Sequence, residues 1–235
     1  IGQEEALNFR CREGPDQRKW APDQAESAIA DLGHIQYAQK NTEFLDHPNF
    51  YLGCILPDCV NLGGFAKKEI RWHSHLRAAD LSQWEENALA FYQKNRDSIS
   101  APLLTGYVIH ILTDILWDRY FHEEIWSQAQ KMEPQIQNGF DPGWNECFRF
   151  DKERMISPWW QNVIRPLLEQ ACPIPINGLS VSLEKNYLQY IKRGFLWPRP
   201  AFLLWSTWKR LGIICFLPEQ KSFTKFRKNF HRTKF

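Results

Sequence analysis

The chain has 235 residues, a length that fits one large domain or two small ones with a sizeable hydrophobic core. Charged residues make up 24% of a mixed, non-repetitive sequence, which excludes wholesale disorder, collagen and coiled coil. The formal net charge of +2 argues against a protein dedicated to duplex DNA, because such proteins carry a large basic excess. Aromatic residues are abundant, with 11 Trp, 16 Phe and 7 Tyr, and they suit a deep core, a ligand wall or an interface.

The charge is divided unevenly along the chain. From Arg199 to the last residue there are nine Lys and Arg against one acid, which gives +8 and leaves −6 on residues 1–198. We therefore expect three parts: a loose lead-in over residues 1–22, one multi-helix domain over residues 23–198, and a basic, aromatic C-terminal segment over residues 199–235.

The first part of the expected domain shows helical periodicity. Residues 23–44 repeat apolar side chains at steps of three and four residues. Gly33 interrupts that pattern, so the segment is either one kinked helix or two helices, with His34 at the join. The apolar segment 50–58 contains glycine and proline, which favour a short helix or turn over a strand.

The rest of the domain is also predicted to be helical. A polar connection leads to an amphipathic helix over residues 80–96, capped by Asp80 or Ser82. Almost no segment shows the period-2 alternation of a strand, so we expect an all-α fold. Further helices are predicted over residues 102–126, 144–170 and 182–193.

Cysteine usage and hydropathy bear on the compartment. Six cysteines are spread along the chain without a Cys-x2-Cys pair, so we interpret them as mostly free thiols in a reducing compartment. The apolar stretch over residues 201–217 is interrupted by Lys209 and Arg210 and is shorter than the ~20 residues that a bilayer span requires. The N-terminal residues do not resemble a signal peptide. We therefore expect a cytoplasmic protein without a transmembrane helix, and secretion stays open because the sequence does not begin with Met.

His110 and Asp114 lie four residues apart in the predicted helix over residues 102–126, so they share one face of it. That helix is otherwise apolar, and burying an imidazole and a carboxylate is costly unless each finds a partner. A metal ion would satisfy both groups. A hydrogen bond between the two side chains, or their exposure to solvent, is the simpler interpretation of an isolated pair.

Three further segments carry ligand-type side chains beside apolar sequence. Asp58 follows Pro57, His73 and His75 lie in a polar connection, and His34 lies at the predicted helix join. Imidazole and carboxylate ligands from several helices are typical of a zinc site that uses no thiolates. The sequence therefore predicts a metal site assembled from distant segments.

The order of these motifs resembles the zinc-dependent phospholipase C family, and in particular its bacterial branch of small hydrolase-like members. The resemblance implies a phospholipase C/P1 nuclease-like fold, a single compact domain with a metal site between helices. Two more phrases extend the likeness to about residue 193, namely Phe50-Tyr-Leu-Gly and Trp144-Asn-Glu-Cys-Phe-Arg-Phe-Asp. The motifs that carry it are His34, Pro57-Asp58, Ser74-His75 and Gly106-x3-His110-x3-Asp114.

The resemblance also implies a set of metal ligands. His34 would bind a second zinc ion, with Asp114 bridging the pair. His75 is preferred over His73 because the family's motif has a small residue before the His, and His73 would then be a surface or supporting group. The first zinc ion would be bound by four side chains: Asp58, His75, His110 and Asp114.

Fuller members of the family bind a third metal through a further His and a His-x3-Glu pair. His122 is the candidate for the first of these, and the sequence contains no His-x3-Glu pair. Glu123, Glu146 or Asp151 would have to substitute, and each is more simply interpreted as a solvated or helix-pairing carboxylate. We therefore expect one or two zinc ions as the cofactor.

The activity that the resemblance implies is phosphodiester hydrolysis by metal-activated water, with Asp58 as the general base. A lipid is one candidate class of substrate. Two other interpretations stay open. One is a helical His-Asp phosphohydrolase, which requires an adjacent His-Asp pair that this chain lacks. The other is a degenerate member of the same fold that binds metal or acts as a scaffold without catalysis.

The segment over residues 199–235 alternates bases with Phe, which suits peripheral contact with an anionic membrane. A solvated terminus, or a helix docked on the acidic body, explains the pattern equally well, and binding of single-stranded nucleic acid ranks third. Five tryptophans in the helical segments are interpreted as core or groove residues: Trp117, Trp126, Trp144, Trp159 and Trp160.

Overall fold

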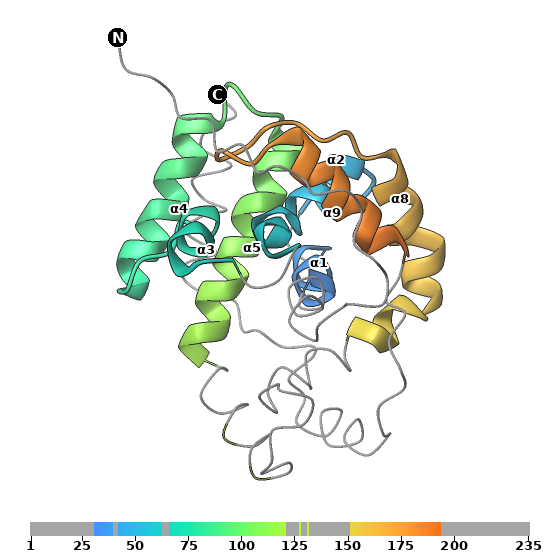
Figure 1. Ribbon diagram of the computed structural model, residues 1–235, viewed down its shortest axis with the longest axis horizontal. Helices are drawn as coiled ribbons and strands as arrows, with labels where there is room; N and C mark the ends of the chain where they lie inside the picture. The colour runs from blue at the N-terminus through green and yellow to red at the C-terminus, as the bar shows by residue number, and fades with distance from the viewer. Residues whose placement is uncertain are drawn as a thin grey trace.

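The computed structural model of the chain describes residues 31–39, 42–62, 66–120 and 151–193, together with residues 127 and 131. This part is all-α, as the sequence predicts, and it contains an isolated β-bridge between Ile176 and Leu179 (Figure 1). Residues 151–155 are also helical. The helices are α1 (Asp31–Gln39), α2 (Pro48–Gly53), the 3₁₀ helix η2 (Leu56–Asn61), α3 (Lys68–Ser74), α4 (Leu81–Asn95), α5 (Ala101–Tyr120), the π-helical turn η3 (Trp160–Ile164), α8 (Arg165–Gln170) and α9 (Val181–Arg193).

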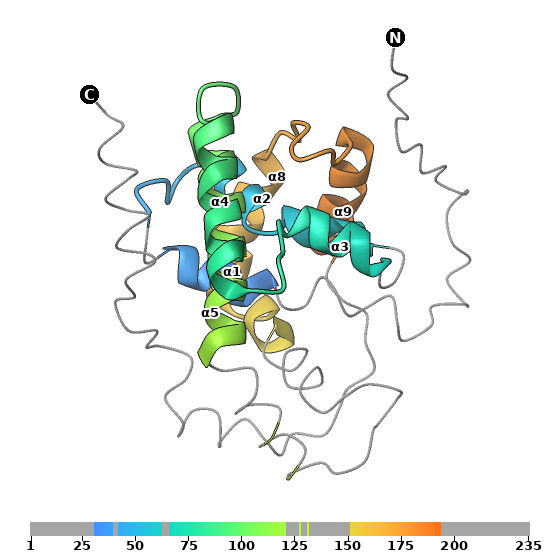
Figure 2. The same ribbon diagram turned by 90° about the vertical axis from the view of Figure 1, so that its left-hand side faces the viewer.

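The long helix α5 is the element around which the others pack. It contacts α1, α2, α4 and η2, and α4 runs alongside it in both views (Figures 1 and 2). Every residue from Leu103 to Leu112 is buried. Burial on nearly all sides explains why this helix is apolar all round instead of amphipathic.

Helices α2 and α5 approach each other through two glycines. A Cβ atom on Gly53 would lie 2.3 Å from the carbonyl oxygen of Leu103, and one on Gly106 would lie 2.2 Å from that of Phe50. Neither position therefore has room for a side chain. The close approach brings the backbone of Cys54, directly after α2, against α5.

Helix α4 follows the sequence prediction closely. Asp80 is its N-cap, and the carboxylate accepts a hydrogen bond from the Gln83 amide at 2.9 Å. The apolar face of the helix packs into the core through three buried side chains: Trp84, Ala88 and Tyr92.

The local structure differs from expectation in two places. Within residues 31–39, α1 continues through Gly33, so His34 lies inside a helix and the expected join at this point is wrong. The expected polar connection before His75 is the helix α3, whose lysine, glutamate and arginine are good helix formers. The segment 50–58 is helical, as predicted.

The C-terminal part of the described chain packs on the same core. Helix α8 contacts α2 and α9, and α9 contacts η2. Trp160 is buried and Trp159 is partly buried against the core, as expected. The three described cysteines are free thiols, two of them buried and one exposed: Cys54, Cys59 and Cys172.

Several predictions concern residues that the structure does not describe. They are the domain boundaries at residues 22 and 198, the basic segment 199–235, and Trp126 and Trp144, all of which stay predictions. Among the described helices, none combines the length and the apolar character that crossing a membrane would take.

Candidate metal centre

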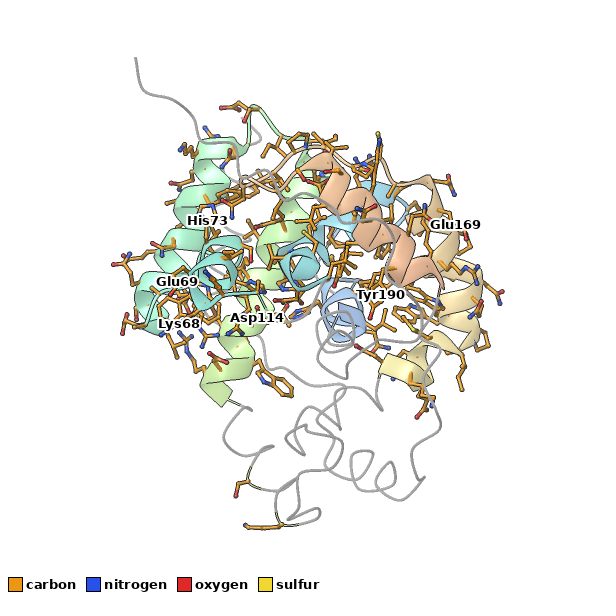
Figure 3. All side chains as sticks on the ribbon, in the orientation of Figure 1. Lys68, Glu69, His73, Asp114, Glu169 and Tyr190 are labelled. Atoms are coloured by element: carbon orange, nitrogen blue, oxygen red, sulfur yellow. The ribbon has the colours of Figure 1, made fainter. Side chains whose placement is uncertain are left out.

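Five predicted ligands come together although they are far apart in the sequence. They lie where α5 passes α1 and the end of α3, at the position that Asp114 marks in Figure 3. The sixth predicted ligand, His122, lies outside the described residues. The five are His34 from α1, Asp58 from η2, His75 directly after α3, and His110 and Asp114 from α5.

Two imidazole nitrogens face two carboxylates at the centre of this group. His75 Nε2 lies 3.3 Å from Asp58 Oδ1 and 3.6 Å from Asp114 Oδ2. His110 Nε2 lies 3.7 Å from Asp58 Oδ2 and 3.6 Å from Asp114 Oδ2. The two Nε2 atoms are 3.3 Å apart. Tetrahedral ligands ~2.0–2.1 Å from a zinc ion lie about 3.3–3.5 Å from one another, and the three pairs formed by His75 Nε2, His110 Nε2 and Asp114 Oδ2 are close to that spacing.

Backbone carbonyls orient both of these imidazoles. His110 Nδ1 lies 2.7 Å from the Cys54 carbonyl oxygen, which the glycine contact between α2 and α5 brings into reach. His75 Nδ1 lies 2.9 Å from the carbonyl oxygen of Arg71. When each Nδ1–H donates to its carbonyl, each Nε2 is left unprotonated and directed at the carboxylates. This arrangement is typical of histidines that bind metal.

His34 extends the group on the other side of Asp114. Its Nε2 lies 3.4 Å from Asp114 Oδ1, and its ring stacks on His110 with centroids 3.9 Å apart. The Nδ1 atom of His34 is buried without a hydrogen-bond partner in the described part of the chain. Because the two oxygens of Asp114 face different imidazoles, the carboxylate is arranged as a bridging ligand would be.

Burial shapes the protonation of these groups in the absence of a cation. Burial, with the charge of His75, lowers the pKa of His34 to about 3, and burial holds the pKa of His110 well below its usual range. Burial raises the pKa of Asp114 to about 7. Burial alone would lower the pKa of His75, but its hydrogen bond with Asp58 and the charges of Asp58 and Asp114 raise it. The neutral imidazoles of His34 and His110, beside two carboxyl groups, belong to a donor set that fits zinc.

Side chains from other elements hold the end of α3 that carries His75. Four consecutive carbonyls, from His73 to Leu76, each accept a side-chain hydrogen bond, which satisfies groups that a helix end leaves unpaired. Leu76 adopts a left-handed conformation, with φ of 53°, and ends the helix there. In the order of the carbonyls, the donors are Asn177 Nδ2, the Tyr107 hydroxyl, Trp84 Nε1 and Asn87 Nδ2.

Sequence reasoning missed these four donors because each is far from His75 in the chain. The sequence does contain a signal for one donor, the turn dipeptide Asn177-Gly178, but its link to the metal centre was not predicted. His73 is exposed, as expected for a residue outside the ligand set.

Asp151 differs from its expectation. It was expected to be a solvated or helix-pairing carboxylate, and the first of these is wrong, because the side chain is fully buried. Burial and the charge of Asp58 raise its pKa well above the usual range. Glu123 and Glu146, the other candidates for a third metal, lie outside the described residues.

Comparison with protein families identifies the chain at a coarse level. The family model of zinc dependent phospholipase C matches residues 25–146, which is more than half of the chain and contains all five predicted ligands that meet at the centre. The chain belongs to the zinc-dependent phospholipase C family. Comparisons with curated proteins and with solved structures gave no significant match. For a zinc-dependent phospholipase C, the His and Asp groups that could hold a metal support a zinc-dependent, phospholipase-like function.

Proposed function

We propose that the chain is a zinc-dependent hydrolase that cleaves a phosphodiester with water as the nucleophile. The supporting observation is the convergence of two Nε2 atoms and two carboxylates at 3.3 to 3.7 Å, in groups that could hold a metal ion. When bound, zinc lowers the pKa of water and neutralises charge on the attacking and leaving oxygens of a phosphodiester. His34 and Asp114 would hold a second ion. The residues that would hold the first are Asp58, His75, His110 and Asp114.

The exposure of these side chains gives the direction of access. The His110 side chain is fully buried and that of His34 is 8% exposed, so these two form the floor of the centre. Asp58 and Asp114 are 14% and 24% exposed, so a substrate would approach on their side. Asp58 would then take the proton of the attacking water, since a carboxylate at the edge of a metal centre lies within reach of that water.

Hydrolysis of chromogenic diesters tests the proposal. We expect the zinc-loaded full chain to hydrolyse a phosphodiester, to lose this activity on chelation and to regain it when zinc is restored. A phosphocholine diester compared with a nucleotide diester distinguishes lipid-like from nucleotide substrates. Asp58→Asn should lower kcat at least about a hundredfold, because it removes a general base.

Two neighbouring histidines provide a matched control. His75→Ala should abolish activity and lower the zinc content, whereas His73→Ala, two residues away and exposed, should change neither. Zinc bound by the wild type without hydrolysis of any phosphodiester would contradict the enzyme proposal. That result would favour a metal-binding or scaffold module of the same fold.

A further inference from the structure

Two observations place Arg77 near the candidate metal centre: its position in the chain and its ion pair with α5. Along the chain, Arg77 follows His75 by two residues, just after the left-handed residue Leu76. On α5, its ion-pair partner Asp118 lies one helical turn, ~5–6 Å, beyond Asp114.

The guanidinium group of Arg77 is held in a fixed place. Its Nη2 donates to the carboxylate of Asp118. Its Cζ lies 4.5 Å from the centroid of the buried Trp84 ring and 5.9 Å from that of Trp72. Stacking on an indole fixes the plane of a guanidinium, so little side-chain freedom is lost when it binds a ligand.

The remaining donors of Arg77 are available to a ligand. Within the part of the chain that the structure describes, Nε and Nη1 donate to no protein group. The side chain is 39% exposed, and Asp114 at the centre is 24% exposed, so solvent reaches both groups. A second cation lies close by, since Lys68 Nζ is 4.4 Å from the centroid of the Trp72 ring that Arg77 also contacts (Figure 3).

We propose that Arg77 binds a phosphate oxygen of the substrate beside the metal centre. A guanidinium presents parallel N–H donors that match phosphate, and a fixed one does so at low entropic cost. Through its ion pair with Asp118, the guanidinium is held next to a residue one helical turn from Asp114. This inference rests on the proposed function and adds to it a phosphate subsite outside the ligand set.

Binding of inorganic phosphate to the zinc-loaded full chain tests the subsite without turnover. Isothermal titration calorimetry would compare the wild type with Arg77→Gln, after zinc analysis and circular dichroism of both proteins. We expect Arg77→Gln to keep its zinc and to bind phosphate about tenfold to a hundredfold more weakly, because it loses hydrogen bonds to a charged ligand.

Arg96 offers a matched control. Its side chain is 41% exposed, against 39% for Arg77, and it caps the far end of α4. Arg96→Gln should leave the affinity for phosphate unchanged. A general effect of surface charge would instead weaken phosphate binding in both variants, and equal weakening would contradict the proposal.

A second variant keeps the test decisive if Arg77→Gln does not fold. Arg77→Lys retains the charge and much of the stem but lacks the planar fork, so it should still weaken phosphate binding severalfold. Wild-type affinity for phosphate in the folded variant overturns the subsite, whichever variant is used. Failure of the wild type to bind zinc would contradict the proposed function instead.

Two further ligands distinguish the source of the phosphate. Dimethyl phosphate and a short-chain phosphatidylcholine below its micelle concentration should lose affinity in Arg77→Gln by a factor similar to that of inorganic phosphate. This result is expected because the three ligands share the phosphate group. A loss confined to the lipid would show that Arg77 contacts another part of that molecule, and would overturn the proposal.

Discussion

The two ends of the described chain bury carboxyl groups in different ways. Up to α5, Asp58 and Asp114 face imidazole rings at 3.3 to 3.7 Å. After residue 150, Asp151 and Glu184 are fully buried, and neither forms an ion pair with another described residue. Burial raises the pKa of Glu184 to about 8 and holds that of Asp151 well above its usual range.

A buried acid without a cation beside it can take up a proton, and we expect Asp151 and Glu184 to be neutral near pH 7. At the metal centre, protonation of a carboxyl group would leave the Nε2 atoms of His75 and His110 still facing each other at 3.3 Å. A shared proton or a metal ion relieves that contact. Burial of an acid is therefore a weak sign of a metal centre, whereas a buried acid that meets oriented imidazoles is a strong one.

The largest expected effect comes from the glycine contact between α2 and α5, which helps to build the metal centre. Gly106→Ala would place a Cβ atom against the backbone of Phe50, so α2 and α5 must move apart and the Cys54 carbonyl must leave His110. We expect a loss of about 3 kcal/mol in the free energy of unfolding, together with loss of zinc. Denaturant unfolding and zinc analysis measure the two effects.

The neighbouring substitution Thr105→Ala provides the control, because it removes atoms from the same buried stretch of α5 instead of adding them. It should leave the zinc content unchanged. If Gly106→Ala keeps both its stability and its zinc, the contact between α2 and α5 does not position His110.

Sequence reasoning reached part of the centre from local spacing alone. His110 and Asp114 share a helical face by their separation of four residues, and their nearest polar atoms are 3.6 Å apart. The other three predicted ligands come from separate elements, so no periodicity predicts their meeting. Their residue types made them candidates, and the family resemblance chose His75 over His73 and assigned the ligand roles. The burial of Asp151 and the stacking of Arg77 were not predicted, since both depend on tertiary contacts.

The fold was predictable where the helices are strongly patterned. The cap at Asp80 and the apolar stretch of α5 have direct sequence signals. Helix α3 was missed because its charged, short sequence has no apolar stripe. An isolated glycine inside an apolar helix often has a packing reason, and Gly106 was a signal of the contact with α2 that we did not use.

A smaller effect tests the protonation of a buried carboxyl group after residue 150, that of Glu184. The folded-state pKa of Glu184, about 8, lies above the ordinary glutamate value of 4.5, so the folded chain binds the proton more tightly than the unfolded chain. The stabilising contribution is complete below about pH 4.5 and is lost as the pH rises through about 8. Glu184→Gln should therefore match the wild type near pH 4.5 and melt at a higher temperature, by a few degrees, at pH 9.

Differential scanning calorimetry across this pH range measures the effect. Glu169 on α8, which is half exposed, is the control, and Glu169→Gln should show no such dependence. A constant difference between Glu184→Gln and the wild type at all pH values would show that Glu184 is not protonated in the folded chain.

The smallest effect concerns the hydrogen bonds by which Asn177, after residue 150, supports the end of α3 that carries His75. Asn177 donates to the His73 carbonyl at 2.9 Å and to the Tyr107 hydroxyl at 3.0 Å, from a residue with φ of 50°. Asn177→Gly keeps that backbone conformation accessible and removes both hydrogen bonds. We expect a cost of about 1 kcal/mol and severalfold weaker zinc binding, measured by chelator competition. Unchanged zinc affinity would show that Asn177 does not support His75.

Metal analysis of the purified full chain tests the central claim most directly. We predict at least about one zinc ion per chain, because His and Asp groups at the centre could hold a metal ion, and a loss of that zinc in His110→Ala. Substoichiometric zinc in the wild type that His110→Ala leaves unchanged would contradict it.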